Sequence, residues 1–225
     1  MIHYHGTPIG GSRQDAARFL ISRHALVPFS RQDDMGIVAD VCQGFVFDNG
    51  AFSVWKRGGK LDLKGYTSWV VDWCKHPGFQ WALIPDEIEG NEADNDAHIE
   101  AWADSGLALY GVPVWHMHES ADRLIRLAEE WPTVALGSSG QWPTPGTDGW
   151  WGRISHAMHE ICDEKGRPRC RLHGLRMMDP DIFGQLPLAS ADSTNAAVNG
   201  GSLKRFGSYI PPHCISASCS GSGTD

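Results

Sequence analysis

The chain has 225 residues, of which 41% are hydrophobic and 20% charged, with a net charge of −8. This length suits one sizeable core, and the composition excludes general disorder. The acidic balance argues against broad, non-specific nucleic-acid binding, which needs clustered Lys and Arg, but it leaves room for a local basic groove.

No uncharged apolar run approaches the roughly 18 residues of a membrane span. The first residues also lack the basic and apolar regions of a signal peptide. We therefore expect a cytoplasmic protein that has no contact with a membrane. The six cysteines are scattered through the chain, which argues against a disulfide framework.

Eight short apolar runs are typical of buried strands. In chain order they cover residues 2–8, 25–29, 44–47, 81–85, 112–115, 133–136, 171–175 and 187–191. Helical patterns lie between them at residues 13–22, 66–74, 92–105, 120–131 and 150–163, the first two capped by Ser12 and Asp62. Strands that alternate with helices indicate a parallel sheet, and eight of them indicate a compact (β/α)8 barrel of the TIM type. We expect one catalytic domain over residues 1–212 and a mobile polar tail over residues 213–225.

Polar residues follow the predicted strands at their carboxyl ends, where barrel enzymes keep their active sites. These residues are Asp48, Asp86, Glu87, His116, Gly137, Ser138, His173 and Asp192. Acids packed together raise at least one pKa, and two carboxylates across a cleft suit glycosyl chemistry. In the alternative interpretation the acids are structural. Asp48 would then only cap the Asn49-Gly50 turn, while others cap helices or pair with an Arg.

The segment from Asp48 to Ser53, Asp-Asn-Gly-Ala-Phe-Ser, resembles the Asp-Ser-Gly-Gly-Phe-Gln motif of the tRNA-guanine transglycosylase superfamily. Over residues 40–200, later strand ends resemble the family in the same order. The matching segments are Ile84–Glu87 (its base-recognising Asp-Glu), Val114–His116 (a strand ending in Gln), Ala135–Ser138 (Ile-Gly-Gly), Leu172–Leu175 (Leu-Met-Gly-Val) and Ala191–Ala196 (the nucleophilic Asp). Within this superfamily, the chain resembles the short phage-type 7-deazaguanine DNA transglycosylases.

The resemblance implies a pentosyltransferase that replaces guanine in DNA, or alternatively RNA, with a free 7-deazaguanine base such as preQ0. Asp192 would be the covalent nucleophile and Asp48 its acid/base partner. Asp86 and Gly137 would hold the base, with His116, Ser138 and His173 nearby and Phe52 or Trp115 stacked on it. A homodimer or an accessory protein would be compatible, and a phage-encoded enzyme would act in the host cytoplasm.

The chain departs from the family in three ways. The Cys-rich zinc motif is absent, the Arg of the Pro-Thr-Arg segment is missing, and His116 replaces a base-binding Gln. We expect no cofactor. A zinc ion at His213, Cys214 and Cys219 is a weaker alternative, because the second Cys pair of a structural zinc site is lacking. Candidate contacts to a nucleic acid are Arg153, Arg167, Arg169, Arg171, Lys204 and Arg205.

Two other functions stay open. A metal-dependent hydrolase on the same barrel would use His3, His5, His116, His118, His173 and Asp192 as ligands. A non-catalytic module that binds a deazapurine or a modified nucleotide is also compatible with the sequence.

Overall fold

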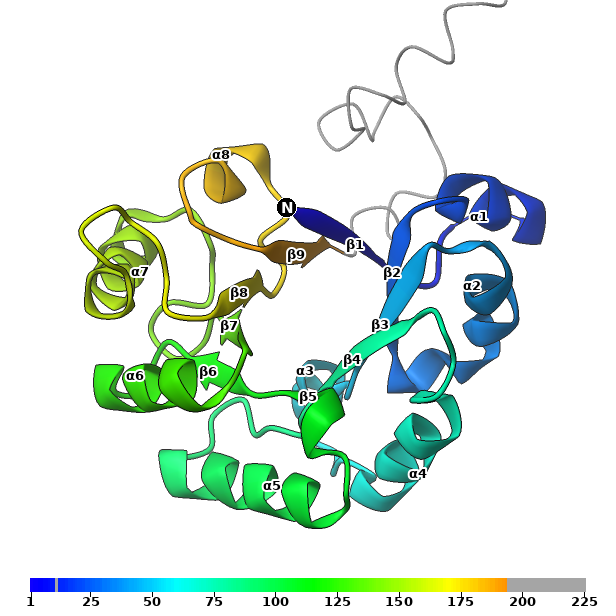
Figure 1. Ribbon diagram of the computed structural model, residues 1–225, viewed down its shortest axis with the longest axis horizontal. Helices are drawn as coiled ribbons and strands as arrows, with labels where there is room; N and C mark the ends of the chain where they lie inside the picture. Colours follow the sequence, from blue (N-terminus) through cyan, green and yellow to red (C-terminus); the bar gives the residue numbers. More distant parts are fainter. Residues whose placement is uncertain (11, 194–225) are drawn as a thin grey trace, which may run out of the picture.

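The computed structural model describes residues 1–10 and 12–193, and these form one sheet of nine parallel strands. The strands are β1 (Ile2–Gly6), β2 (His24–Pro28), β3 (Gly44–Asp48), β4 (Phe79–Leu83), β5 (Gly111–Val112), β6 (Val114–His116), β7 (Thr133–Gly137), β8 (Arg171–Gly174) and β9 (Ser190–Ser193). Their order in the sheet is β5-β4-β3-β2-β1-β9-β8-β7-β6. Figure 1 shows the sheet curled into a nearly closed barrel, with helices around it.

The two edge strands of the sheet are consecutive in the chain, since only Pro113 separates β5 from β6. On one side Ile84 N–H donates to Val112 O, and on the other Ala135 N–H donates to Pro113 O. Residues 111–116 thus pair with β4 through their first half and with β7 through their second. Pro113 has no N–H to donate, so the ladder breaks there.

Helices and 3₁₀ turns connect the strands. They are α1 (Arg13–Leu20), η1 (Phe29–Asp34), α2 (Met35–Val41), α3 (Ala51–Lys56), α4 (Leu63–Trp73), α5 (Glu92–Asp104), η2 (Ala108–Tyr110), α6 (Ala121–Glu130), α7 (Asp148–Ile161) and α8 (Pro180–Phe183). The predicted caps are confirmed: Ser12 forms a capping box with Asp15, and the Asp62 side chain accepts from Gly65 N–H.

The core has an inner and an outer part. Inside the barrel, Tyr4, Leu26 and Val46 from β1, β2 and β3 pack with Trp81, and a second inner cluster joins β4 to β7. The opposite faces of the strands pack against the helices, as Phe47 does against Trp69 of α4. Because side chains alternate along a strand, residues two positions beyond an inner residue also point inward.

Several boundaries differ from the sequence-based expectation. β4 starts at Phe79 rather than Trp81, and β9 covers 190–193 rather than 187–191, so Asp192 lies within the strand. Backbone ladders extend over polar residues that an apolar pattern leaves out. The short helices α2, α3 and α8 were not predicted, because four to seven residues are too few to show a helical period.

None of the helices described here is long and apolar enough to cross a membrane. The predicted tail, 213–225, lies outside the described residues, as do Lys204 and Arg205.

Candidate active site

Four inner-face residues meet at the carboxyl ends of the strands. Asp48, His116 and Gly137 each lie two positions beyond an inner-cluster residue, namely Val46, Val114 and Ala135. Asp192 lies two positions beyond Ser190, which bonds the inner-facing ring of His173. Strand alternation thus places these four residues on the inner face, at the carboxyl ends of their strands.

Asp48 is both a turn cap and a candidate catalytic acid. Its Oδ1 accepts from Gly50 N–H at 2.9 Å, and Gly50 has φ +80°, which only glycine adopts at little cost. Burial is the main cause that raises the pKa of Asp48, from 3.8 to about 6. The charges of Asp192 and Asp86 raise this pKa further, against the Gly50 hydrogen bond and Arg176, which lower it. The turn-capping role of Asp48 is therefore compatible with a catalytic role.

Asp192 is buried, and its Oδ1 accepts from Arg176 N–H at 2.9 Å. His173 Nε2 lies 3.4 Å from the same oxygen, and its Nδ1 is 2.9 Å from Ser190 Oγ. His173 is fully buried between Tyr4 and Trp81. It therefore lies beneath Asp192 inside the barrel, where its Nε2 has no hydrogen-bond partner in the described part of the chain. Among the described residues, neither Asp48 nor Asp192 has a hydrogen-bond partner on Oδ2.

Asp86 is held between two side chains. Its Oδ1 accepts from Asn49 Nδ2 at 2.7 Å, and its Oδ2 lies 2.8 Å from His116 Nε2. A carboxylate accepts hydrogen bonds, so Nε2 of His116 carries a proton toward Asp86, and in the tautomer with one ring proton Nδ1 is an acceptor. That Nδ1 is buried and has no partner in the described part of the chain. The pair therefore offers a hydrogen-bond acceptor to a ligand N–H group.

Gly137 makes room for this arrangement. A Cβ at residue 137 would lie 3.1 Å from His116 Nδ1, too close for an undisturbed contact. The adjacent Ser138 accepts at Oγ from Trp150 Nε1–H, and its carbonyl oxygen lies 3.5 Å from Arg176 Nη2. Ser138 thus helps to hold this side of the site in place through both its side chain and its backbone.

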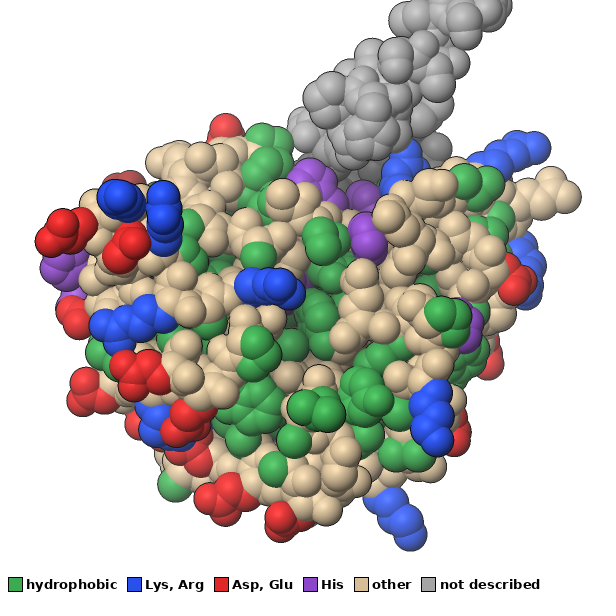
Figure 2. Space-filling model, in the orientation of Figure 1, with side chains coloured by type: hydrophobic (Ala, Val, Ile, Leu, Met, Phe, Trp, Pro, Cys, Tyr) green, Lys and Arg blue, Asp and Glu red, His purple; other side chains and the backbone are tan. Residues whose placement is uncertain are grey.

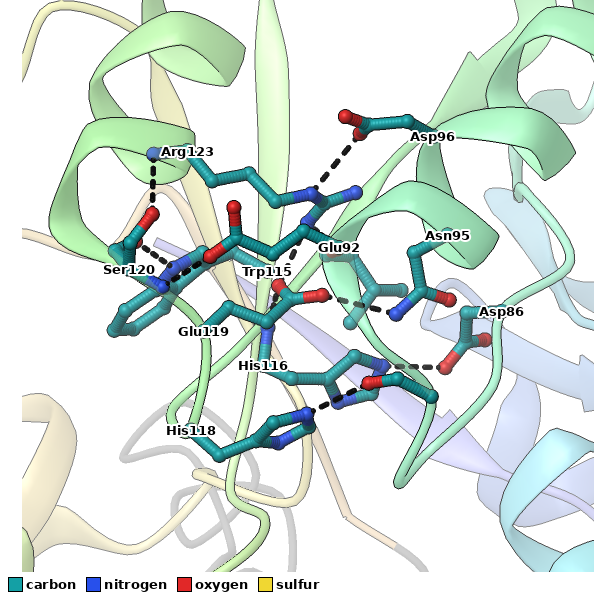
Figure 3. A network of polar contacts seen from close by, with 12 residues as sticks. Asp86, Glu92, Asn95, Asp96, Trp115, His116, His118, Glu119, Ser120 and Arg123 are labelled. Carbon is teal, nitrogen blue, oxygen red and sulfur yellow. Dashed lines mark hydrogen bonds and ion pairs between the residues drawn. The ribbon is translucent and has the colours of Figure 1, made fainter.

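A buried polar network holds the backbone of His116 in place (Figure 3). Glu119 accepts from His116 N–H at 2.8 Å, from Asn95 Nδ2 at 2.9 Å and from Arg123 Nη1 at 2.7 Å. Arg123 is also paired with Asp96. His118 lies beside His116 and bridges Ser139 Oγ and Gly90 O. This network ties β6 and α6 to the loop that follows β4.

Two cavities flank α3 beside these residues. One, of about 800 Å³, is lined by Asp86, Glu87 and Gly90 on one side and by Trp55 of α3 on the other. The second, of about 580 Å³, has Asn49, Gly50 and Arg57 in its wall. Asp86 therefore faces a cavity of a size that holds a small ligand.

Three predicted residues lie apart from the four inner-face residues. Trp115 is fully buried, packs in the outer core and donates from Nε1 to Ser120 O, so it cannot stack on a base. The alternation of strand β6 turns it away from the site. Glu87 contacts His98 and, among the described residues, forms no hydrogen bond with Asp48 or Asp192. Phe52 is exposed at the mouth of the site, where Arg176 lies 4.2 Å above its ring.

The proposed barrel metal site is not assembled. His5 packs on Phe19 of α1 and His3 on Phe183 of α8, so both face the outer layer. The residues described here contain no group of three His, Cys, Asp or Glu placed to hold a metal ion. The alternative zinc ligands His213, Cys214 and Cys219 lie outside the described residues.

Sequence reasoning missed Asn49 and Arg176. Asn49 looks like a turn residue, yet its side chain joins Ile84 O, Asp86 and Ala51 N–H. Arg176 follows β8 by two residues and was detectable as a strand-end residue. Its positive φ, +58°, aims its N–H at Asp192, which no sequence pattern indicates. Comparison with family models, with curated proteins and with solved structures finds no match to this chain.

Proposed function

We propose that this chain is a pentosyltransferase that exchanges guanine in nucleic acid for a 7-deazaguanine such as preQ0. The resemblance favours DNA as the substrate. We further propose that β5 and β6 are one strand interrupted at Pro113, so that the sheet is a compact (β/α)8 barrel. One arrangement carries the proposal: Asp48 and Asp192 are carboxylates on the inner faces of β3 and β9, and each is held at Oδ1 by a backbone N–H group.

Two carboxylates with different environments suit the two roles of a retaining glycosyl transfer. Asp192 is held at Oδ1 by the Arg176 N–H, which leaves Oδ2 to attack C1′ of the target nucleotide. The bond between C1′ and the guanine ring nitrogen breaks while the ester bond to Asp192 forms. Asp48, protonated in part near neutral pH, donates a proton to the departing guanine.

The second half-reaction runs in reverse with the incoming base. Asp48, now ionised, removes the proton from the ring nitrogen of the 7-deazaguanine, which attacks C1′ and releases Asp192. One N-glycosidic bond replaces another, so no energy input is needed. The Asp86–His116 pair lies beside this chemistry, and its free Nδ1 can accept from a ring N–H.

Trapping the covalent intermediate tests the proposal. Wild-type protein incubated with a guanine-containing oligonucleotide, without an incoming base, should form an adduct that survives a denaturing gel. Asp192→Asn should form none, because a neutral amide cannot make the ester. Asp48→Asn should be slow in both half-reactions. Asp122→Asn, an exposed carboxylate on α6, is the matched control and should behave as wild type.

If Asp192→Asn exchanges labelled guanine at the wild-type rate, the mechanism is wrong. If Asp192→Asn binds guanine normally and wild-type protein never forms an adduct, the chain is a binding module rather than a transferase.

A further inference from the structure

The segment after Asp48, residues 51–64, differs from the rest of this acidic chain. It comprises α3, the loop that follows it and the first two residues of α4, and we call it the α3 segment. It contains four cations, Lys56, Arg57, Lys60 and Lys64, and a single acid, Asp62. Asp62 is used as the cap of α4. The segment is therefore a local basic stretch in a protein whose net charge is −8.

Two aromatic side chains of α3 are exposed. Phe52 is 38% and Trp55 is 43% accessible, and their ring centroids lie 5.8 Å apart. A spacing of three residues places them on one face of the helix, and Lys56 follows Phe52 at four. Trp55 Nε1–H donates to Glu89 Oε2 at 3.3 Å, while the ring remains partly exposed. Exposed aromatic rings beside positive charges are the pattern of surfaces that stack nucleobases.

The cations of the α3 segment are not neutralised by protein acids. Within the described residues, Lys56, Lys60 and Lys64 form no ion pair, and Arg57 bonds only Ser53 O of its own helix. Arg57 and Lys60 line the cavity of about 580 Å³ together with Asn49 and two acids, Asp33 and Asp62. The cavity therefore carries no excess of positive charge, and it is the exposed side chains of Lys56, Arg57 and Lys60 on the surface that can bind phosphates.

Arg176 extends the positive charge of the α3 segment toward the active site. Its guanidinium lies on Phe52, and its charge lowers the pKa of Asp48, so it stands between the α3 segment and the carboxylates. A nucleotide whose C1′ reaches Asp192 would have its phosphates at this mouth.

Other basic candidates are occupied or distant. Arg153 donates to Met117 O and Glu119 O and packs on Trp115, and Arg169 is paired with Glu129.

In Figure 1 the start of β1 is near the viewer, whereas α3 is drawn fainter because it lies farther away, inside the ring of helices. On the near face, Figure 2 shows Lys and Arg scattered among Asp and Glu around the rim. The α3 segment lies at the opposite end of the barrel, where the strands finish.

We propose that the α3 segment and Arg176 are the docking surface for unpaired nucleic-acid strand on either side of the target nucleotide. Trp55 and Phe52 stack on neighbouring bases, and Lys56, Arg57, Lys60 and Arg176 bind phosphates. The inference rests on the proposed function, because base exchange inside a barrel requires the target nucleotide to leave its stack. It adds the form of the substrate, a single-stranded or locally opened region, and the surface that holds it.

Fluorescence anisotropy with a labelled single-stranded oligonucleotide tests the surface. The triple variant Lys56→Ala, Arg57→Ala, Lys60→Ala should bind at least about tenfold more weakly. The slope of log K against log salt should fall by about 2, since each lost contact to a single strand removes roughly 0.7. Trp55→Ala should weaken binding about fivefold or more through lost stacking, and Trp55→Phe should restore most of it.

The matched control removes two exposed cations from the other end of the barrel. Lys75→Ala with Lys165→Ala changes the loops that precede β4 and β8 and should leave affinity and salt slope unchanged. Guanine affinity of each variant, measured by calorimetry, checks that the site and the fold are intact. Wild-type affinity in the triple variant, or an equal loss in the control, overturns the inference.

The outcomes separate this inference from the proposed function. An adduct on Asp192 together with unchanged oligonucleotide binding by the triple variant would leave the function standing and reject the surface. Binding that depends on the α3 segment, without any adduct, would keep the surface and reject the transferase.

Discussion

The carboxyl of Asp48 illustrates how a single residue couples stability to chemistry. Burial and two neighbouring acids raise its pKa to about 6, while its Oδ1 remains bonded to Gly50 N–H. The folded state therefore holds a proton on Asp48 at a pH where the unfolded chain has released it. The unfolded chain binds fewer protons between about pH 4 and 6, so the free energy of unfolding falls as the pH rises through this window.

Asp48→Asn should abolish this pH dependence, because the amide keeps the Gly50 hydrogen bond and does not ionise. At about 1.4 kcal/mol per pKa unit, ionised Asp48 lowers the free energy of unfolding by up to about 3 kcal/mol. The variant should match wild type near pH 4 and exceed it by up to that amount above pH 7. Urea unfolding at both pH values measures the difference. A variant less stable than wild type at pH 8 would contradict this account.

Asp86 sets the hydrogen-bonding character of His116. As a carboxylate it accepts from Nε2–H and leaves Nδ1 as an acceptor. In Asp86→Asn the amide can donate to Nε2 instead, which would place the proton on Nδ1 and make it a donor. A ligand N–H group would then face a second donor instead of an acceptor, and the hydrogen bond to His116 would be lost.

Guanine affinity should accordingly fall at least about tenfold in Asp86→Asn, equivalent to about 1.4 kcal/mol. His116→Ala should lose a similar amount by removing the acceptor. Calorimetric titration measures both, and His156→Ala, an exposed His on α7, is the control. Unchanged affinity in both site variants would exclude this pair from base binding.

At the scale of elements, one buried ion pair links β6, α5 and α6. Both side chains, Glu119 and Arg123, are essentially inaccessible, and Glu119 also holds His116 N–H and Asn95. A single change leaves the other charge buried with fewer partners, which costs far more than the loss of an exposed pair.

Glu119→Gln should lower the free energy of unfolding by about 3 to 5 kcal/mol. The exposed pair of Arg169 and Glu129 provides the comparison, and Arg169→Met should cost about 1 kcal/mol or less. Urea unfolding measures both variants. Equal small losses would mean that the network contributes little to holding β6 in place.

At the scale of the whole molecule, the curled sheet decides which strand ends meet. Asp48 on β3 and Asp192 on β9 are separated in the sheet by β2 and β1, and His116 is on β6. A flat sheet would keep these residues apart along one edge. Curling brings all of them to a common inner face, which a nearly closed barrel provides.

The sequence by itself determined the alternation of strands and helices, the caps at Ser12 and Asp62, and the strand ends that bear acids. Local rules govern these features, because apolar runs, capping side chains and the Asn49-Gly50 turn act over a few residues.

Only the tertiary structure decided which side chains face inward and which partners they find. Trp115 and His116 are neighbours in the chain, yet alternation buries one in the outer layer and aims the other at Asp86. Asn49, Arg176 and the α3 segment acquire their roles through contacts with strands far away in sequence. Such contacts depend on how the sheet curls, and no local pattern encodes the distance between two strand ends.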